Sequence, residues 1–155
     1  MKLVDILHTD LIIHPLKKSS KVDVIKELLT LLAEKRIIQN KELILKAVLD
    51  RETIMTTGVG NGVAIPHCKS NDLPGFAMAL GIHQDGVNFQ SLDGKPAQII
   101  FLLIGPENKP ATHIRLLSRI SRILSKSEVR QKILAGNSAD IMQTIASEES
   151  ILEIN

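Results

Sequence analysis

The residue best suited to chemistry in this sequence is His67, which directly follows Pro66 and the glycine-rich stretch T-T-G-V-G-N-G-V-A-I. Proline fixes its own φ and biases Ile65 towards an extended conformation, so the chain reaches His67 on a stiff approach. A neutral imidazole is a nucleophile that can accept a phosphoryl group. The residues alone leave two interpretations open: a functional histidine, or a turn whose histidine is merely solvated.

Glycines alternate with other residues in the stretch before this histidine. Their spacing does not match a dinucleotide fingerprint, which needs glycine or alanine where Val63 stands, and the chain has no G-x-x-x-x-G-K-[ST] motif. Successive backbone N–H groups beside such glycines can instead form a concavity that binds an anion. We therefore expect Gly60, Asn61 and Gly62 to form a phosphate-binding loop for His67.

Two more polar residues fall on the apolar side of helical patterns. Arg51 follows Ile44 by seven residues, so it shares the buried stripe at the end of a predicted helix. His113 heads the apolar stripe of a later helix, in line with Ile120. For His113 the alternative is an ordinary core histidine satisfied by hydrogen bonds. The opposite side of that later helix is basic, which we interpret as a solvated face: Arg115, Arg119, Arg122 and Lys126.

Composition excludes several other functions. No H-E-x-x-H occurs and the five histidines do not share metal-ligand spacing, so no metal site is expected. Three Phe, no Trp or Tyr and a formal net charge of +2 give little with which to bind nucleic acid. The single cysteine, Cys68, fits a reducing compartment, and the sequence contains neither a signal peptide nor a membrane span. We therefore expect a cytoplasmic protein without a nucleic-acid partner and without membrane insertion.

Hydrophobic periodicity predicts the elements that must position these residues. A capping box that begins at Ser20 and an N-cap candidate at Asn40 predict two helices, from about 21 to 35 and from Asn40 to near Arg51. The second has a buried stripe of Leu43, Ile44, Ala47 and Val48. Three further helices are predicted at about 112–125, 127–136 and 138–145. Strands are predicted over 76–83 and 97–104, and Asp85-Gly86 predicts a hairpin turn before 87–89. This alternation predicts one α/β domain over residues 1–155.

The stretch L-D-R-E-T-I-M-T-T-G-V-G-N-G-V-A-I-P-H closely resembles the signature of the EIIA domain of the fructose/mannitol class of the bacterial phosphoenolpyruvate-dependent phosphotransferase system. H-I-R-L-L-S-R-I-S-R-I-L resembles the family's helix that carries a second histidine, and the length matches one EIIA domain. The resemblance implies a mixed sheet of about five strands flanked by helices on both faces. It also implies that His67 is phosphorylated, that His113 is the second active-site histidine and that Arg51 helps hold the phosphoryl group.

The resemblance further implies a phosphotransferase that takes phosphate from a histidine phosphocarrier protein and needs no cofactor. Gly60-Asn61-Gly62 is similar to the fructose and nitrogen-regulatory branches, because mannitol-type relatives have an acidic residue at the place of Asn61. Our first interpretation is a free-standing regulatory EIIA of the nitrogen type, which signals to regulatory target proteins. A sugar-uptake EIIA that passes phosphate to a fructose-type EIIB domain is the alternative, and a non-catalytic regulatory binding module is the alternative of another class. Cys68 is expected to be a bystander.

Overall fold

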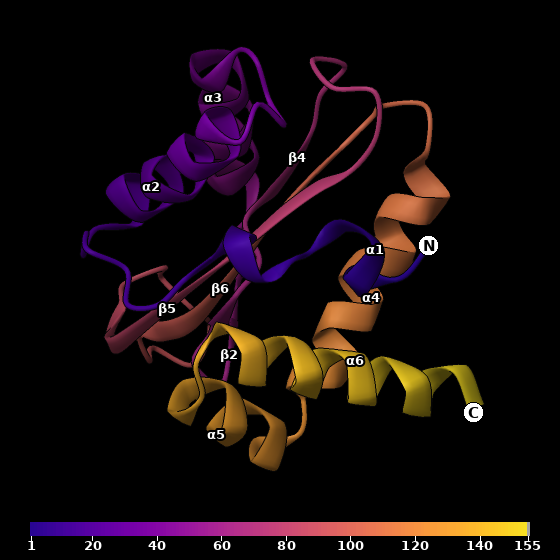
Figure 1. The fold of residues 1–155 in the computed structure, drawn as a ribbon. Coiled ribbons are helices and arrows are strands. Elements are labelled where there is room, and N and C mark those ends of the chain that lie inside the picture. Colours follow the sequence, from indigo (N-terminus) through magenta and orange to yellow (C-terminus); the bar gives the residue numbers. More distant parts are fainter. Residues whose placement is uncertain (155) are drawn as a thin grey trace.

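A six-stranded mixed sheet lies at the centre of the molecule, in a computed structural model that describes residues 1–154 (Figure 1). The strand order is β1-β5-β6-β3-β2, and β4 pairs with β6 farther along the edge that β3 occupies. The central pair, β5 and β6, is antiparallel, whereas β3 and β4 run parallel to β6. The strands are β1 (Ile12–Ile13), β2 (Gly58–Gly60), β3 (Val63–Ala64), β4 (His67–Lys69), β5 (Ala77–Val87) and β6 (Ala97–Gly105).

Helices cover both faces of this sheet, as the resemblance implied. Figure 1 shows α2 and α3 on one side and α4, α5 and α6 on the other. Two of the predicted caps are present: the Ser20 hydroxyl accepts the N–H of Asp23, and the Asn40 side chain accepts the N–H of Leu43. The helices are α1 (Leu3–Ile6), α2 (Lys21–Glu34), α3 (Lys41–Ile54), α4 (Pro110–Leu124), α5 (Ser127–Ala135) and α6 (Ser138–Ile154), with a 3₁₀ turn, η1 (Thr9–Leu11).

Aliphatic side chains make up most of the core. Eight of the nine residues of β6 are buried, which is typical of a strand covered on both faces. Phe89 and Phe101 are the largest fully buried side chains. Among residues 1–154, no helix combines the length and the apolar character needed to cross a membrane.

The predicted hairpin turn at Asp85-Gly86 is wrong, because β5 continues through these residues to Val87. The pairing with β6 is irregular between Ile82 and Val87, and Gly86 has φ +85°. A β-bulge and a tight turn both favour glycine at positive φ, so the sequence signal does not separate them. The N–H of Gly86 donates to Nδ1 of His83, which holds the bulge in place.

Other differences from the sequence prediction concern which residues face neighbouring helices. Leu43 is 52% exposed although it was expected in the buried stripe of α3, and Leu45 is buried instead. The basic side of α4 is not simply solvated, since Arg119 donates to Glu149 and Glu153 of α6. Helix α6 runs to Ile154, well past the predicted end, because it packs along α1 and α4. These pairings depend on contacts far apart in sequence, which helical periodicity alone does not reveal.

Candidate active site

One surface pocket brings together Arg51, His67 and His113, which the sequence had singled out separately. Arg51 comes from the last turn of α3, His67 opens β4, and His113 lies in the first turn of α4. Their meeting follows from the topology, because α3 packs on β4 and α4 begins shortly after the end of β6, next to β4. The remaining residues that line the pocket are Ala47, Cys68, Lys69, Ile114 and Leu117.

His67 is held by the pairing of β4 with β6. It pairs with Leu103 of β6, and the N–H of Leu103 donates to the carbonyl of Pro66. The next residue, Cys68, is buried in the core. Because successive side chains of a strand point to opposite faces, His67 and Lys69 lie on the other face from Cys68.

The hydrogen bonding of His67 assigns its tautomer. Nδ1 lies 2.8 Å from the carbonyl oxygen of Ile65, which can only accept, so Nδ1 carries the proton and donates. In the neutral ring Nε2 is then unprotonated and nucleophilic. Burial lowers the pKa of His67, the bond to Ile65 opposes that effect, and the charge of Arg51 lowers it further. The imidazole is therefore neutral, with a free electron pair on Nε2, at neutral pH.

His113 is a second neutral imidazole beside the first. The ring centroids of His67 and His113 are 5.6 Å apart, and the ring centroid of Phe76 lies 6.0 Å from that of His113. Burial lowers the pKa of His113 to about 4, and the charge of Lys69 and that of His67 in its protonated form act in the same direction. Its Nδ1 is buried and has no hydrogen-bond partner among residues 1–154. Unpaired buried polar atoms are uncommon in folded proteins, and they are often found where a ligand or a reaction supplies the partner.

Gly105, at the end of β6, makes room for His113, and the sequence analysis did not identify it. A Cβ built on Gly105 would lie 2.8 Å from Nδ1 of His113 and 2.3 Å from Cε1 of Phe76. Any side chain here would therefore displace one or both rings. The only local signal is a glycine that ends a long apolar strand, and this signal does not indicate which side chains approach it.

Two cations stand at the pocket. Arg51 is half-buried, and its Nη1 donates to the carbonyl of Met55 over 3.1 Å. No carboxylate lies within ion-pair distance of Arg51 in residues 1–154. Lys69 also lines the pocket, and its charge lowers the pKa of both His67 and His113. The pocket can therefore receive an anion between two neutral imidazoles and two positive side chains.

The turn formed by Gly60, Asn61 and Gly62 does not lie beside His67, contrary to the sequence-based expectation. It connects β2 to β3, with φ values of +96°, +58° and +78° at the three residues. The register explains the separation: Val63 pairs with Ile99 of β6, whereas His67 pairs with a residue four positions farther on, about 13 Å along the strand. The N–H of Asn61 donates to the Asp93 carboxylate instead. None of these three residues lines the pocket of His67, and their phosphate-binding role stays a prediction.

Cys68 differs from His67 in its surroundings although the two are adjacent. Burial raises the pKa of the Cys68 thiol to about 12, so the thiol keeps its proton at neutral pH and is a poor nucleophile. Within the part of the chain that the structure describes, no three His, Cys, Asp or Glu side chains form a group that could hold a metal ion.

Sequence comparison identifies relatives over nearly the whole chain. The family model described as "Phosphoenolpyruvate-dependent sugar phosphotransferase system, EIIA 2" matches residues 5–148. The PTS system fructose-specific EIIABC component of Bacillus subtilis is 34% identical over 148 residues, which cover 96% of this chain and 23% of that protein. A nitrogen regulatory protein of Bradyrhizobium diazoefficiens is also 34% identical over 148 residues, which cover 94% of each chain.

Solved structures share the fold. The nitrogen regulatory protein IIA-Ntr from Neisseria meningitidis matches with a TM-score of 0.85 and 27% identity, over 91% of this chain and 97% of that one. The complex of enzyme IIA mannitol with phosphorylated enzyme IIB mannitol from Escherichia coli matches with a TM-score of 0.78 over 91% of this chain and 97% of the matched chain. At 17% identity, this second match speaks for the fold alone.

Proposed function

Because the chain belongs to the EIIA 2 family of the phosphoenolpyruvate-dependent sugar phosphotransferase system, we propose that it accepts a phosphoryl group on Nε2 of His67. The donor is a histidine phosphocarrier protein that carries the group as phosphohistidine. One observation supports this most strongly: Nδ1 of His67 donates to the Ile65 carbonyl and leaves Nε2 as the nucleophile in a pocket that also holds Arg51 and His113.

The transfer forms one N–P bond as another breaks. The electron pair on Nε2 of His67 bonds to phosphorus, and the pair of the donor's N–P bond returns to the donor imidazole. Phosphoryl transfer is loose, so the protein mainly aligns donor and acceptor and stabilises the charge on the phosphoryl oxygens. Arg51 and Lys69 supply positive charge, and His113 offers a neutral imidazole. The Ile65 carbonyl keeps the proton on Nδ1 while the ring gains positive charge.

Exposed apolar residues around the pocket support a protein donor rather than a small molecule. Ile114, which lines the pocket, is 65% exposed, and Ile54 and Met55 beside Arg51 are exposed as well. Side chains of this kind near a site are typical of protein interfaces. We propose that the phosphocarrier protein docks here, and that an EIIB domain or a regulatory target protein uses the same face.

Within the family, we propose the regulatory role of the nitrogen type. The match to the Neisseria IIA-Ntr structure and the coverage of the Bradyrhizobium nitrogen regulatory protein support it. The alternative, transfer to a fructose-type EIIB in sugar uptake, is supported by the fructose-specific Bacillus relative. A chase experiment separates the two: fast loss of phosphate to a fructose-type EIIB domain favours uptake, and retention of the phosphate favours regulation.

The basic test is phosphorylation with purified components. Incubation with phosphoenolpyruvate, the first enzyme of the system and its phosphocarrier should add one phosphate that is labile in acid and stable in base. His67→Ala should remain unphosphorylated under the same conditions. A phosphate that persists in His67→Ala would disprove the assignment, and no phosphate on either protein would support the non-catalytic binding module.

A further inference from the structure

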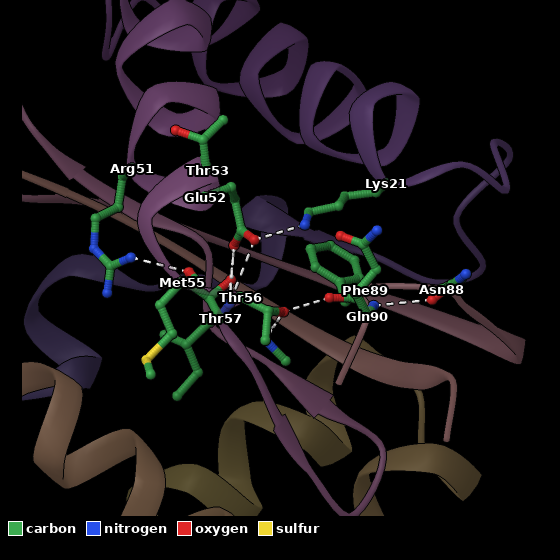
Figure 2. A network of polar contacts seen from close by, with 12 residues as sticks. Lys21, Arg51, Glu52, Thr53, Met55, Thr56, Thr57, Asn88, Phe89 and Gln90 are labelled. Carbon is green, nitrogen blue, oxygen red and sulfur yellow. Dashed lines mark hydrogen bonds and ion pairs between the residues drawn. The ribbon is translucent and has the colours of Figure 1, made fainter. Parts of the chain in front are cut away.

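A buried carboxylate lies next to Arg51 in the sequence and is bound on several sides. Glu52 is 8% exposed, and its carboxylate accepts the N–H of Thr57 at 3.2 Å and also the Thr57 hydroxyl. Its other oxygen forms an ion pair of 2.7 Å with Lys21, the first residue of α2. Figure 2 shows these contacts converging from Lys21 in α2, Glu52 near the end of α3 and Thr57, just before β2. Each polar atom of the carboxylate is therefore used.

The same cluster extends to a fourth segment, the connection between β5 and β6. The Thr56 hydroxyl donates to the carbonyl of Phe89, whose ring is fully buried (Figure 2). The Lys21 ammonium lies 5.6 Å from the centroid of that ring, which favours a cation–π contact. The short link between α3 and β2 is thus tied through Thr57 and Glu52 to α2, and through Thr56 to Phe89.

We propose that Glu52 is a positioning residue for Arg51 and that it acts through this link. Glu52 and Thr57 close a short loop, and Met55 lies inside it. The carbonyl of Met55 is the group that accepts from Nη1 of Arg51 (Figure 2). The fixed loop therefore holds one hydrogen-bond acceptor at the place that orients the guanidinium. This inference rests on the proposed function of Arg51 in holding the phosphoryl group.

The charges in the cluster are consistent with this role. Lys21 pairs with Glu52, so the buried carboxylate is neutralised without Arg51. The guanidinium of Arg51 has no carboxylate partner within residues 1–154, and its charge remains available to phosphoryl oxygens. Arginine has a long, mobile side chain, and a displacement of about 1 Å at a group that positions a reactant can cost about 10²-fold in rate.

Glu149 provides a matched control on the other side of the molecule. It is also a buried carboxylate, at 1% exposure, and it accepts the backbone N–H groups of Leu3 and Val4 at 2.7 and 3.0 Å. Arg119 donates to it over 3.3 Å. Glu149 resembles Glu52 in burial and bonding, but its partners lie in α1 and α4 and do not line the pocket. Loss of a buried carboxylate should therefore destabilise both Glu52→Gln and Glu149→Gln. The rate of phosphoryl transfer should fall only in Glu52→Gln.

The experiment measures single-turnover phosphorylation of the whole chain by the phosphorylated phosphocarrier, at several phosphocarrier concentrations. We expect Glu52→Gln to lower the maximal rate by about 10²-fold or less, with little change in the half-saturating phosphocarrier concentration. Glu149→Gln should lower the melting temperature but keep the unmodified rate. In an Arg51→Ala background, Glu52→Gln should change the rate by no more than about twofold, since the residue through which it acts is gone.

A second pair of variants keeps the test decisive if Glu52→Gln does not fold. Thr57→Val removes the hydroxyl and should slow transfer, whereas Thr57→Ser retains it and should restore the rate. Glu52 acts otherwise than proposed if Glu52→Gln slows the Arg51→Ala protein by the same factor as the unmodified protein, or if both Glu52→Gln and Thr57→Val transfer at the normal rate. Failure of the unmodified protein to accept phosphate would instead contradict the proposed function, so the two failures are distinguishable.

Discussion

The two ends of β6 differ in how completely their polar groups are paired within the protein. At the end near Gln98, the backbone N–H of Gln98 donates to the Gly62 carbonyl, and the Gln98 side chain donates to Gln84. At the end near Gly105, Nδ1 of His113 has no partner among residues 1–154. This second end, called the histidine end below, also holds the unprotonated Nε2 of His67.

Between these two ends of β6, the unpaired group marks the pocket and the flexible backbone does not. The glycine turn at one end has the φ values of an anion-binding loop, but Asp93 already accepts its Asn61 N–H. The histidine end has ordinary backbone geometry and an incomplete set of partners. A protein can leave a buried group unsatisfied where a reaction later satisfies it. The following predictions test this difference, beginning with the largest expected effect.

Removing either support group at the histidine end should strongly reduce transfer. Loss of one preorganised group that stabilises charge typically costs about 10²–10³ in rate. We expect Arg51→Ala and His113→Ala to fold, as checked by circular dichroism, and to accept phosphate that much more slowly in a rapid-quench assay. If both variants accept phosphate at the unmodified rate, these residues are structural and the histidine end has no special role beyond His67.

A pair of glycine substitutions compares the two ends directly. Gly105→Ala places a methyl group 2.3 Å from Phe76 and 2.8 Å from His113, so the rings must shift and transfer should slow. Gly62→Ala introduces a side chain at φ +78° and should destabilise the fold by about 1–2 kcal/mol. Transfer should nevertheless stay normal in Gly62→Ala, measured below its melting temperature. Slow transfer in the folded Gly62→Ala protein would return a catalytic role to the glycine turn.

Part of the fold and of the candidate site could be predicted from the sequence. Local signals were sufficient for the α/β class, for the Ser20 and Asn40 helix caps and for the inward direction of Arg51, because each depends on residues within a few positions. The family resemblance added the pairing of His67 with His113. The location of the glycine turn depends on strand register, which the local pattern leaves open.

Glu52 illustrates the remaining gap more clearly. In the sequence it is one charged residue of L-D-R-E-T, at the end of a helix where an exposed side chain is the normal expectation. Its burial depends on Lys21 and Thr57, and the first of these lies in another helix. The prediction of a hairpin turn at Gly86 was wrong because a turn and a β-bulge use the same residue type, and only the pairing of β5 with β6 separates them. Such features require knowledge of which distant segments meet.

Because of His113, the stability of the folded protein should decrease in mild acid. The pKa of His113 falls from 6.5 to about 4 on folding because the ring is buried. Between these two values the unfolded chain binds a proton that the native state does not, so this residue makes stability decrease as pH falls from about 6.5 towards 4. Urea denaturation at pH 7 and pH 5 measures the free energy of unfolding at each pH. The decrease between pH 7 and pH 5 should be smaller in His113→Leu than in the unmodified protein. Equal losses would mean that His113 is readily protonated in the folded protein.

The smallest effect is expected at Cys68, which adjoins the proposed phosphate acceptor His67 and could itself be suggested as the phosphate carrier. Burial raises the pKa of the thiol to about 12, so the thiolate needed for nucleophilic attack is scarce at neutral pH. Strand alternation also turns this side chain into the core, away from the face that His67 shares with Lys69. Cys68→Ser should therefore accept phosphate with the normal time course, and its label should remain labile in acid and stable in base. A label that is lost in this variant, or that has the lability of a thiol-bound phosphate in the unmodified protein, would move the chemistry from the imidazole to the sulfur.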